Sequence, residues 1–89
     1  MTGDEFIAEA KRIGYRVVSY EFGYDEYKDR SFLRADLSND THVLVKENGA
    51  HMDDTVHSAC FSAALLAMKE TKAGKPLATG DAAMALANF

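Results

Sequence analysis

The stretch DDTVHSACFSAALLAMKETK, residues 53–72, decides the fold of this chain. Its apolar side chains recur at the spacing of an α-helix and form two adjacent rows. The first row holds Val56, Cys60, Ala63 and Ala67, and the second holds Phe61, Leu65 and Met68. The small residues among the bulky ones let a helix approach a sheet closely. The stretch therefore predicts one long helix whose wide apolar face covers a sheet.

Both ends of this helix carry residues that are typical of helix termini. Asp53 or Asp54 can cap its N-terminus, because a carboxylate accepts hydrogen bonds from free backbone N–H groups and suits the positive end of the helix dipole. Lys72 lies near the C-terminus, where positive charge is favourable. Gly74 can end the helix in a left-handed conformation, and Pro76 cannot continue it.

The residues before the long helix predict a shorter helix and three strands. Thr2 and Glu5 have the spacing of a capping box, and Gly14 can end the helix that they begin. Apolar and polar residues then alternate as in strands, over residues 15–22, 30–37 and 41–47. In the first strand, Val18, Tyr20 and Phe22 are expected on one face and Val17 on the other.

A last short helix is expected near the end of the chain. Thr79 can cap it, and the alanine-rich residues 81–87 would form it. Such a short helix is marginal in isolation. It would stay ordered only if Met84, Leu86 or Phe89 docked on the rest of the protein.

Together these elements predict one α+β domain over residues 1–89, in the order α-β-β-β-α-α, with residues 73–89 as a C-terminal extension. The short connectors favour a three-stranded antiparallel meander with the helices on one face. The third strand, residues 41–47, is a candidate free edge of the sheet. The other sheet face would stay solvated and would carry Ser19, Glu21, Phe32, Arg34, Asp36, His42 and Lys46.

Composition excludes several classes of protein. The 89 residues are 47% hydrophobic, as in a folded protein, and the net charge of −4 disfavours binding to nucleic acid or to anionic membranes. The single cysteine cannot form an internal disulfide. No window approaches the roughly 20 apolar residues of a membrane span. We expect a cytoplasmic protein.

The loop after the first strand is the most informative surface feature. Residues 20–29 include four aromatic and four acidic residues. Tyrosine is enriched at the centres of protein interfaces, and carboxylates steer basic partners. The candidate partner-binding residues are Tyr24, Asp25, Glu26, Tyr27 and Asp29, with Asp53 and Asp54 as a second acidic patch. The alternative is that Tyr20 and Phe22 belong to the core and that the rest is a solvated hairpin tip.

The sequence contains no catalytic or metal-binding signature. His57 and Cys60 are three positions apart on the long helix, but structural zinc sites usually have four ligands. Cys60 falls on the apolar face, where burial raises the pKa of a thiol and makes it inert. The glycines are scattered singly, so no phosphate-binding loop is present. We therefore expect no enzymatic activity, no cofactor and no metal.

The order of helix, three strands and helix over residues 4–72 resembles the double-stranded-RNA-binding domain, and residues 59–68 are similar to its alanine-rich packing helix. The resemblance implies the shape. It does not extend to RNA binding, because that family grips phosphates with lysines at the start of the last helix. The matching positions here are Asp53, Asp54, Thr55, Val56 and His57. The loop between the first two strands carries Asp25, Glu26 and Asp29, which phosphates repel.

The small size, the acidity and the lack of enzymatic motifs also resemble small inhibitors encoded by phages and mobile elements, such as anti-CRISPR proteins. This resemblance implies a protein that occludes a basic, nucleic-acid-binding surface of a partner protein in the host cytoplasm. It would contact neither nucleic acid nor membrane. The alternative is a homodimer or another homo-oligomeric structural or accessory subunit, in which the free edge strand or the end of the chain pairs with another copy.

Overall fold

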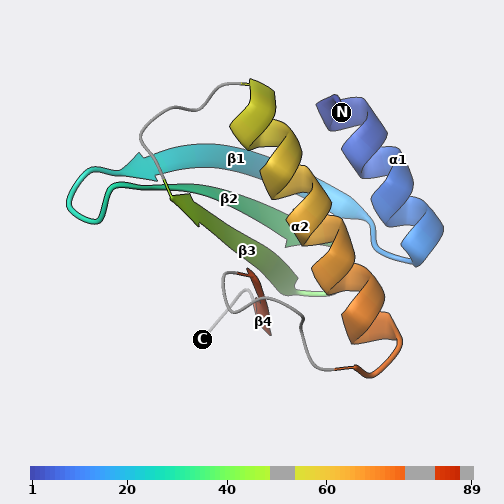
Figure 1. Cartoon of the computed structure of the whole chain (residues 1–89). Helices are drawn as coiled ribbons and strands as arrows, with labels where there is room; N and C mark the ends of the chain where they lie inside the picture. Colours follow the sequence, from blue (N-terminus) through green and yellow to red (C-terminus); the bar gives the residue numbers. More distant parts are fainter. Residues whose placement is uncertain (49–53, 76–81, 87–89) are drawn as a thin grey trace.

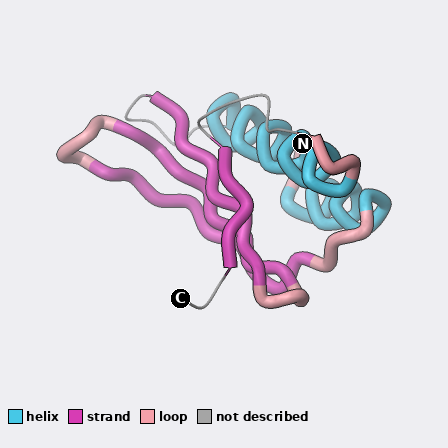
Figure 2. Tube along the Cα trace, turned by 90° about the horizontal axis from the view of Figure 1, so that it is seen from below, coloured by secondary structure: helices cyan, strands magenta, loops and turns pink. Residues whose placement is uncertain are grey.

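The computed structural model describes residues 1–48, 54–75 and 82–86 of the chain. Along the chain the elements are α1 (Gly3–Ile13), β1 (Val17–Asp25), β2 (Arg30–Leu37), β3 (Thr41–Asn48), α2 (Asp54–Lys72) and β4 (Ala82–Leu86). The strands form one antiparallel sheet in the order β1-β2-β3-β4, and both helices cover the same face of it (Figure 1; Figure 2). The predicted α+β class is confirmed, with four strands in place of three.

The C-terminal residues form a strand, and the predicted short helix over residues 81–87 is wrong. Strand β4 pairs with β3, and Val43 lies opposite Met84. Ala82 is buried, and Met84 packs against the core. A helix this short is marginal in water. Hydrogen bonds to the otherwise unpaired N–H and C=O groups along β3 therefore favour a strand for this segment. Strand β3 is therefore an inner strand, and the predicted free edge along residues 41–47 is also wrong.

Strand β1 contains a β-bulge that reverses the predicted orientations of Val17 and Val18. Val17 lies opposite Leu37, but Ser19 lies opposite the residue before Leu37, so β1 has one extra residue at this point. As a result, Val17 faces the core at 9% exposure and Val18 points to solvent at 66% exposure. The predictions that Val18 shares a face with Tyr20 and that Val17 lies on the opposite face are both wrong, because an inserted residue shifts the alternation of side chains.

The core lies between the sheet and the helices. Helix α2 supplies the largest share, as its two apolar rows predict, and its buried members include Cys60, Phe61, Leu65, Ala67 and Met68. Helix α1 contributes Phe6, whose ring stacks on that of Phe61 with 4.6 Å between centroids. The sheet contributes Leu33 and Val45, which lie opposite each other and are fully buried. The predicted apolar face of the long helix is confirmed.

The opposite face of the sheet is mainly polar, as predicted. Arg34 and Asp36 are half-buried there, and Nε of Arg34 lies 3.1 Å from Oδ1 of Asp36. His42 is an exception to the predicted exposure, because it is 7% exposed and pairs with Asp36 on one side and Ala85 on the other. Among the described residues, neither helix combines the length and apolarity needed to cross a lipid bilayer.

The helix termini follow the sequence signals wherever the structure describes them. The Thr2 hydroxyl accepts a hydrogen bond from the backbone N–H of Glu5 at 3.2 Å, and the Glu5 carboxylate accepts one from the backbone N–H of Thr2 at 3.0 Å. Gly14 and Gly74 end α1 and α2 with φ of 116° and 69°. Asp54 is the first residue of α2. The predicted caps Asp53 and Thr79, the stop at Pro76 and the chain end at Phe89 lie outside the described residues.

Candidate hairpin and cleft

The β1–β2 hairpin projects beyond the helical layer (Figure 1; Figure 2). Strand β1 continues to Asp25, which pairs with Arg30 on β2. The predicted loop is therefore shorter than expected, and residues 26–29 form its turn. Because the hairpin extends away from the helices, its tip can contact another molecule without movement of the core.

Three of the predicted site residues hold the turn together. Oδ1 of Asp25 accepts hydrogen bonds from the backbone N–H groups of Tyr27 at 3.0 Å and Lys28 at 3.3 Å. Asp29 adopts φ of 50°, a left-handed conformation that aspartate tolerates better than most residues. The Tyr24 hydroxyl donates to Oδ1 of Asp29 at 2.5 Å, and this hydrogen bond raises the pKa of Tyr24. Tyr24, Asp25 and Asp29 therefore have a structural role in addition to any contact with a partner.

The other two predicted residues of the tip are directed to solvent. Tyr27 is 94% exposed, and Glu26 is also exposed. Tyr24 is less open, at 40% exposure. The side chain of Tyr27 contributes little to the stability of the fold, since it buries almost no apolar surface. The five predicted residues thus lie together on the hairpin. Three of them stabilise the turn, and the other two, Glu26 and Tyr27, point to solvent.

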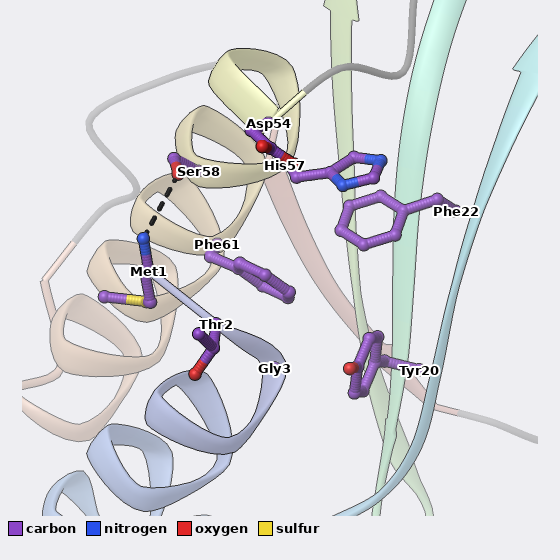
Figure 3. Close-up of a pocket in the computed structure, with 9 residues that line it drawn as sticks. All are labelled: Met1, Thr2, Gly3, Tyr20, Phe22, Asp54, His57, Ser58 and Phe61. Carbon is purple, nitrogen blue, oxygen red and sulfur yellow. Dashed lines mark hydrogen bonds between the residues drawn. The ribbon is translucent and has the colours of Figure 1, made fainter.

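A cleft lies between the start of α1, the first turns of α2 and strand β1 (Figure 3). Its volume of about 530 Å³ is in the range of ligand-binding sites. Gly3 borders it and lets the start of α1 approach β1, because a Cβ atom there would lie 1.8 Å from the Tyr20 hydroxyl. The residues that line the cleft are Met1, Thr2, Gly3, Tyr20, Phe22, Asp54, His57, Ser58 and Phe61.

Aromatic contacts build the walls of this cleft. The rings of Phe22 and His57 stack with 4.0 Å between centroids and 16° between their planes. Tyr20 meets Phe61 edge-on at 5.6 Å. These contacts join β1 to α2. Phe22 is thus partly buried against the core, as the alternative interpretation of residues 20–29 proposed, whereas Tyr20 contacts the core ring of Phe61 but stays 38% exposed.

Of the predicted second acidic patch, the structure describes Asp54, which lies on α2. Asp54 borders the cleft, while Asp53 lies outside the described residues. The cleft residues Tyr20, Phe22 and His57 were not predicted as a group. The regular spacing of Tyr20, Phe22 and Tyr24 along β1 was an available signal. The position of His57 over this row was not, because it depends on how α2 lies across the sheet.

The structure gives Cys60 no features of a nucleophile. Cys60 is fully buried, and burial, with a smaller effect from the charge of Glu47, raises the pKa of its thiol to about 11. The ring of its neighbour His57 is stacked on Phe22. In residues 1–48, 54–75 and 82–86, no three side chains of the types that bind metals form a cluster. His51, which precedes this helix in the sequence, lies outside these ranges.

Comparison of the chain with protein-family models, with curated proteins and with solved structures finds no match. A function must therefore be inferred from the residues of the chain itself.

Proposed function

We propose that this protein is a binding module that attaches to a basic surface of another protein through the tip of its β1–β2 hairpin. The observation that carries the proposal is Tyr27, a tyrosine with 94% of its surface exposed on a turn that contains several carboxylates. The function is occlusion of the partner surface and involves no chemical turnover.

The geometry of the turn supports this proposal. The hydrogen bonds of Asp25 and Asp29 hold the tip in one conformation before any partner arrives, so binding loses less conformational entropy. Tyr27 and Tyr24 offer large, rigid contact areas, which are typical of interface hot spots. The exposed carboxylates, together with the net charge of −4, would speed association with a basic partner.

The partner class follows from this chemistry. Proteins that bind nucleic acid present basic surfaces to its phosphates, and an acidic tip can occupy such a surface. We propose that the protein acts in the cytoplasm on a nucleic-acid-binding protein, in the manner of the phage and mobile-element inhibitors that the chain resembles. The contact residues would be Tyr24, Asp25, Glu26, Tyr27 and Asp29. Asp54 on the cleft rim and Asp53, its neighbour in sequence, would form a second contact apart from the tip.

The test removes the solvent-directed part of the tip and leaves the turn intact. Glu26→Lys with Tyr27→Ala changes two exposed side chains, neither of which has a side-chain hydrogen bond among those described above. The control, Glu9→Lys with Leu66→Ala, makes the same change in charge and removes an exposed apolar side chain from the helices, and it also removes the exposed ion pair between Glu9 and Arg12. Partners would be captured from a lysate of the source cells, identified by mass spectrometry and purified.

We expect the wild type and the control to retain the same partner and the tip variant to lose it. For the purified partner, the dissociation constant should rise by at least about tenfold in the tip variant, which corresponds to roughly 1.4 kcal/mol. Equal retention by all three proteins would refute the proposal. Recovery of this chain alone, with a sedimentation mass above that of one chain, would favour the homo-oligomeric alternative.

A further inference from the structure

The face of the sheet opposite the helices contains an aromatic residue, Phe32, with cationic residues at neighbouring positions. On this face Phe32 lies between Gly23 on β1 and Lys46 on β3. Arg30 and Arg34 are two residues before and after Phe32 on the same strand, so their side chains emerge on the same face. These residues lie on the strands next to the acidic tip. The overall negative charge of the chain gives no sign of them.

The position of the Phe32 ring depends on the glycine across from it. A Cβ atom on Gly23 would lie 2.2 Å from Cζ and 2.5 Å from Cε1 of Phe32, so the end of the ring occupies the space above Gly23. The ring therefore leans over β1, and Phe32 is only half-buried. An aromatic side chain in this position offers an apolar contact to a molecule that lies on the sheet.

A small hollow of about 100 Å³ adjoins the ring and is lined by Asp25, Lys28, Arg30, Phe32 and Lys46. Three of these residues are cations and one is a carboxylate. Asp25 already accepts two backbone hydrogen bonds in the turn. Nη2 of Arg30 lies 3.4 Å from the backbone oxygen of Lys46, which holds the guanidinium beside β3. The hollow thus combines positive charge with one apolar wall in a chain whose net charge is −4.

We propose that this hollow binds an acidic protein segment that presents a carboxylate next to an apolar side chain. The carboxylate would lie among Lys28, Arg30 and Lys46, and the apolar side chain would rest on Phe32. Charge complementarity selects an acidic occupant. The hollow adjoins the hairpin tip and shares Asp25 with it, but its charge is opposite and it would bind a different partner, so the inference goes beyond the proposed function.

The charges around the hollow favour a peptide over nucleic acid. Arg34 is paired with Asp36, and Glu21 lies opposite Arg34 on β1, so carboxylates border the cationic area along the strands. A peptide needs to place only one or two carboxylates in the hollow. A nucleic-acid strand carries a phosphate at every nucleotide, and an extended strand would meet these flanking carboxylates.

The test uses fluorescein-labelled peptides and fluorescence anisotropy at low ionic strength. The probe is Glu-Glu-Phe-Glu-Glu, and the companion probes are Lys-Lys-Phe-Lys-Lys and a short oligothymidylate. The decisive variant is Lys46→Glu, and the matched control is Lys69→Glu, which reverses the charge of an exposed lysine on α2. Circular dichroism would verify that both variants are folded.

We expect the acidic probe to bind the wild type and Lys69→Glu equally, and to bind Lys46→Glu about tenfold more weakly. Lys46→Glu should in turn bind the lysine probe more tightly than the wild type does. Equal binding of the acidic probe to both variants would overturn the proposal, as would no binding to the wild type. Tighter binding of the oligothymidylate than of the acidic peptide would overturn it in favour of a nucleic-acid ligand.

Discussion

At the scale of single residues, Gly23 shows how one missing side chain shapes a surface. Phe32 occupies the space that a Cβ atom on Gly23 would take. We predict that Gly23→Ala destabilises the protein by about 1 kcal/mol, because the ring must move to relieve the overlap. In a Phe32→Ala background the same change should cost nothing or stabilise, since alanine suits a strand better than glycine does. Urea unfolding of the four proteins measures this coupling, and additive effects would show that the ring does not depend on Gly23.

Cys60 gives a prediction about pH. Its pKa rises from an ordinary value of 9.0 to about 11 on folding, because burial disfavours the thiolate. The unfolded chain therefore loses its proton first as the pH rises. The stability linked to this group is fully present below pH 9.0 and is lost progressively toward pH 11.

We predict that the difference in unfolding free energy between the wild type and Cys60→Ala is constant below pH 9.0 and shrinks as the pH approaches 11. Urea unfolding over this range measures it. A thiol reagent should also label native Cys60 slowly at neutral pH and label it rapidly after unfolding. Rapid labelling of the native protein would show that Cys60 is accessible.

At the scale of elements, local sequence patterns predicted the helices and their termini, because these depend on residues close together in the chain. The two apolar rows of residues 53–72 predicted α2, because apolar residues at this spacing form one continuous face of a helix. Thr2 and Gly14 marked the ends of α1. The bulge after Val17 and the strand β4 were missed, because both depend on pairing with a distant segment, and an alanine-rich segment has no strong preference for a strand.

Strand β4 leads to a prediction about hydrogen exchange. In an antiparallel strand, successive amides point to opposite sides. Because β3 has a partner on each side, consecutive amides from His42 to Val45 should all exchange slowly. Strand β1, which ends the described strand order, should show protection at alternate residues only. Nuclear magnetic resonance measures these rates residue by residue. An alternating pattern along β3 would show that β4 does not pair with it in solution.

At the scale of the whole molecule, the chain separates its charges by position. The tip of the β1–β2 hairpin is acidic and aromatic, and the hollow beside Phe32 is cationic. The hairpin could be predicted, because its residues are consecutive. The cleft at Phe22 and His57 and the hollow at Phe32 and Lys46 could not, because they require the packing of α2 and the register of three strands. The net charge of −4 gives no sign of the cationic hollow, because it sums the charges over the whole chain.

The most direct test of the central claim compares the affinity of the captured partner for the wild type, for Glu26→Lys with Tyr27→Ala, and for the control Glu9→Lys with Leu66→Ala. If the hairpin tip is the binding surface, the tip variant should bind at least about tenfold more weakly, while the control should match the wild type. The same affinity for the tip variant and the wild type would contradict the claim and would place the partner on another surface of the protein.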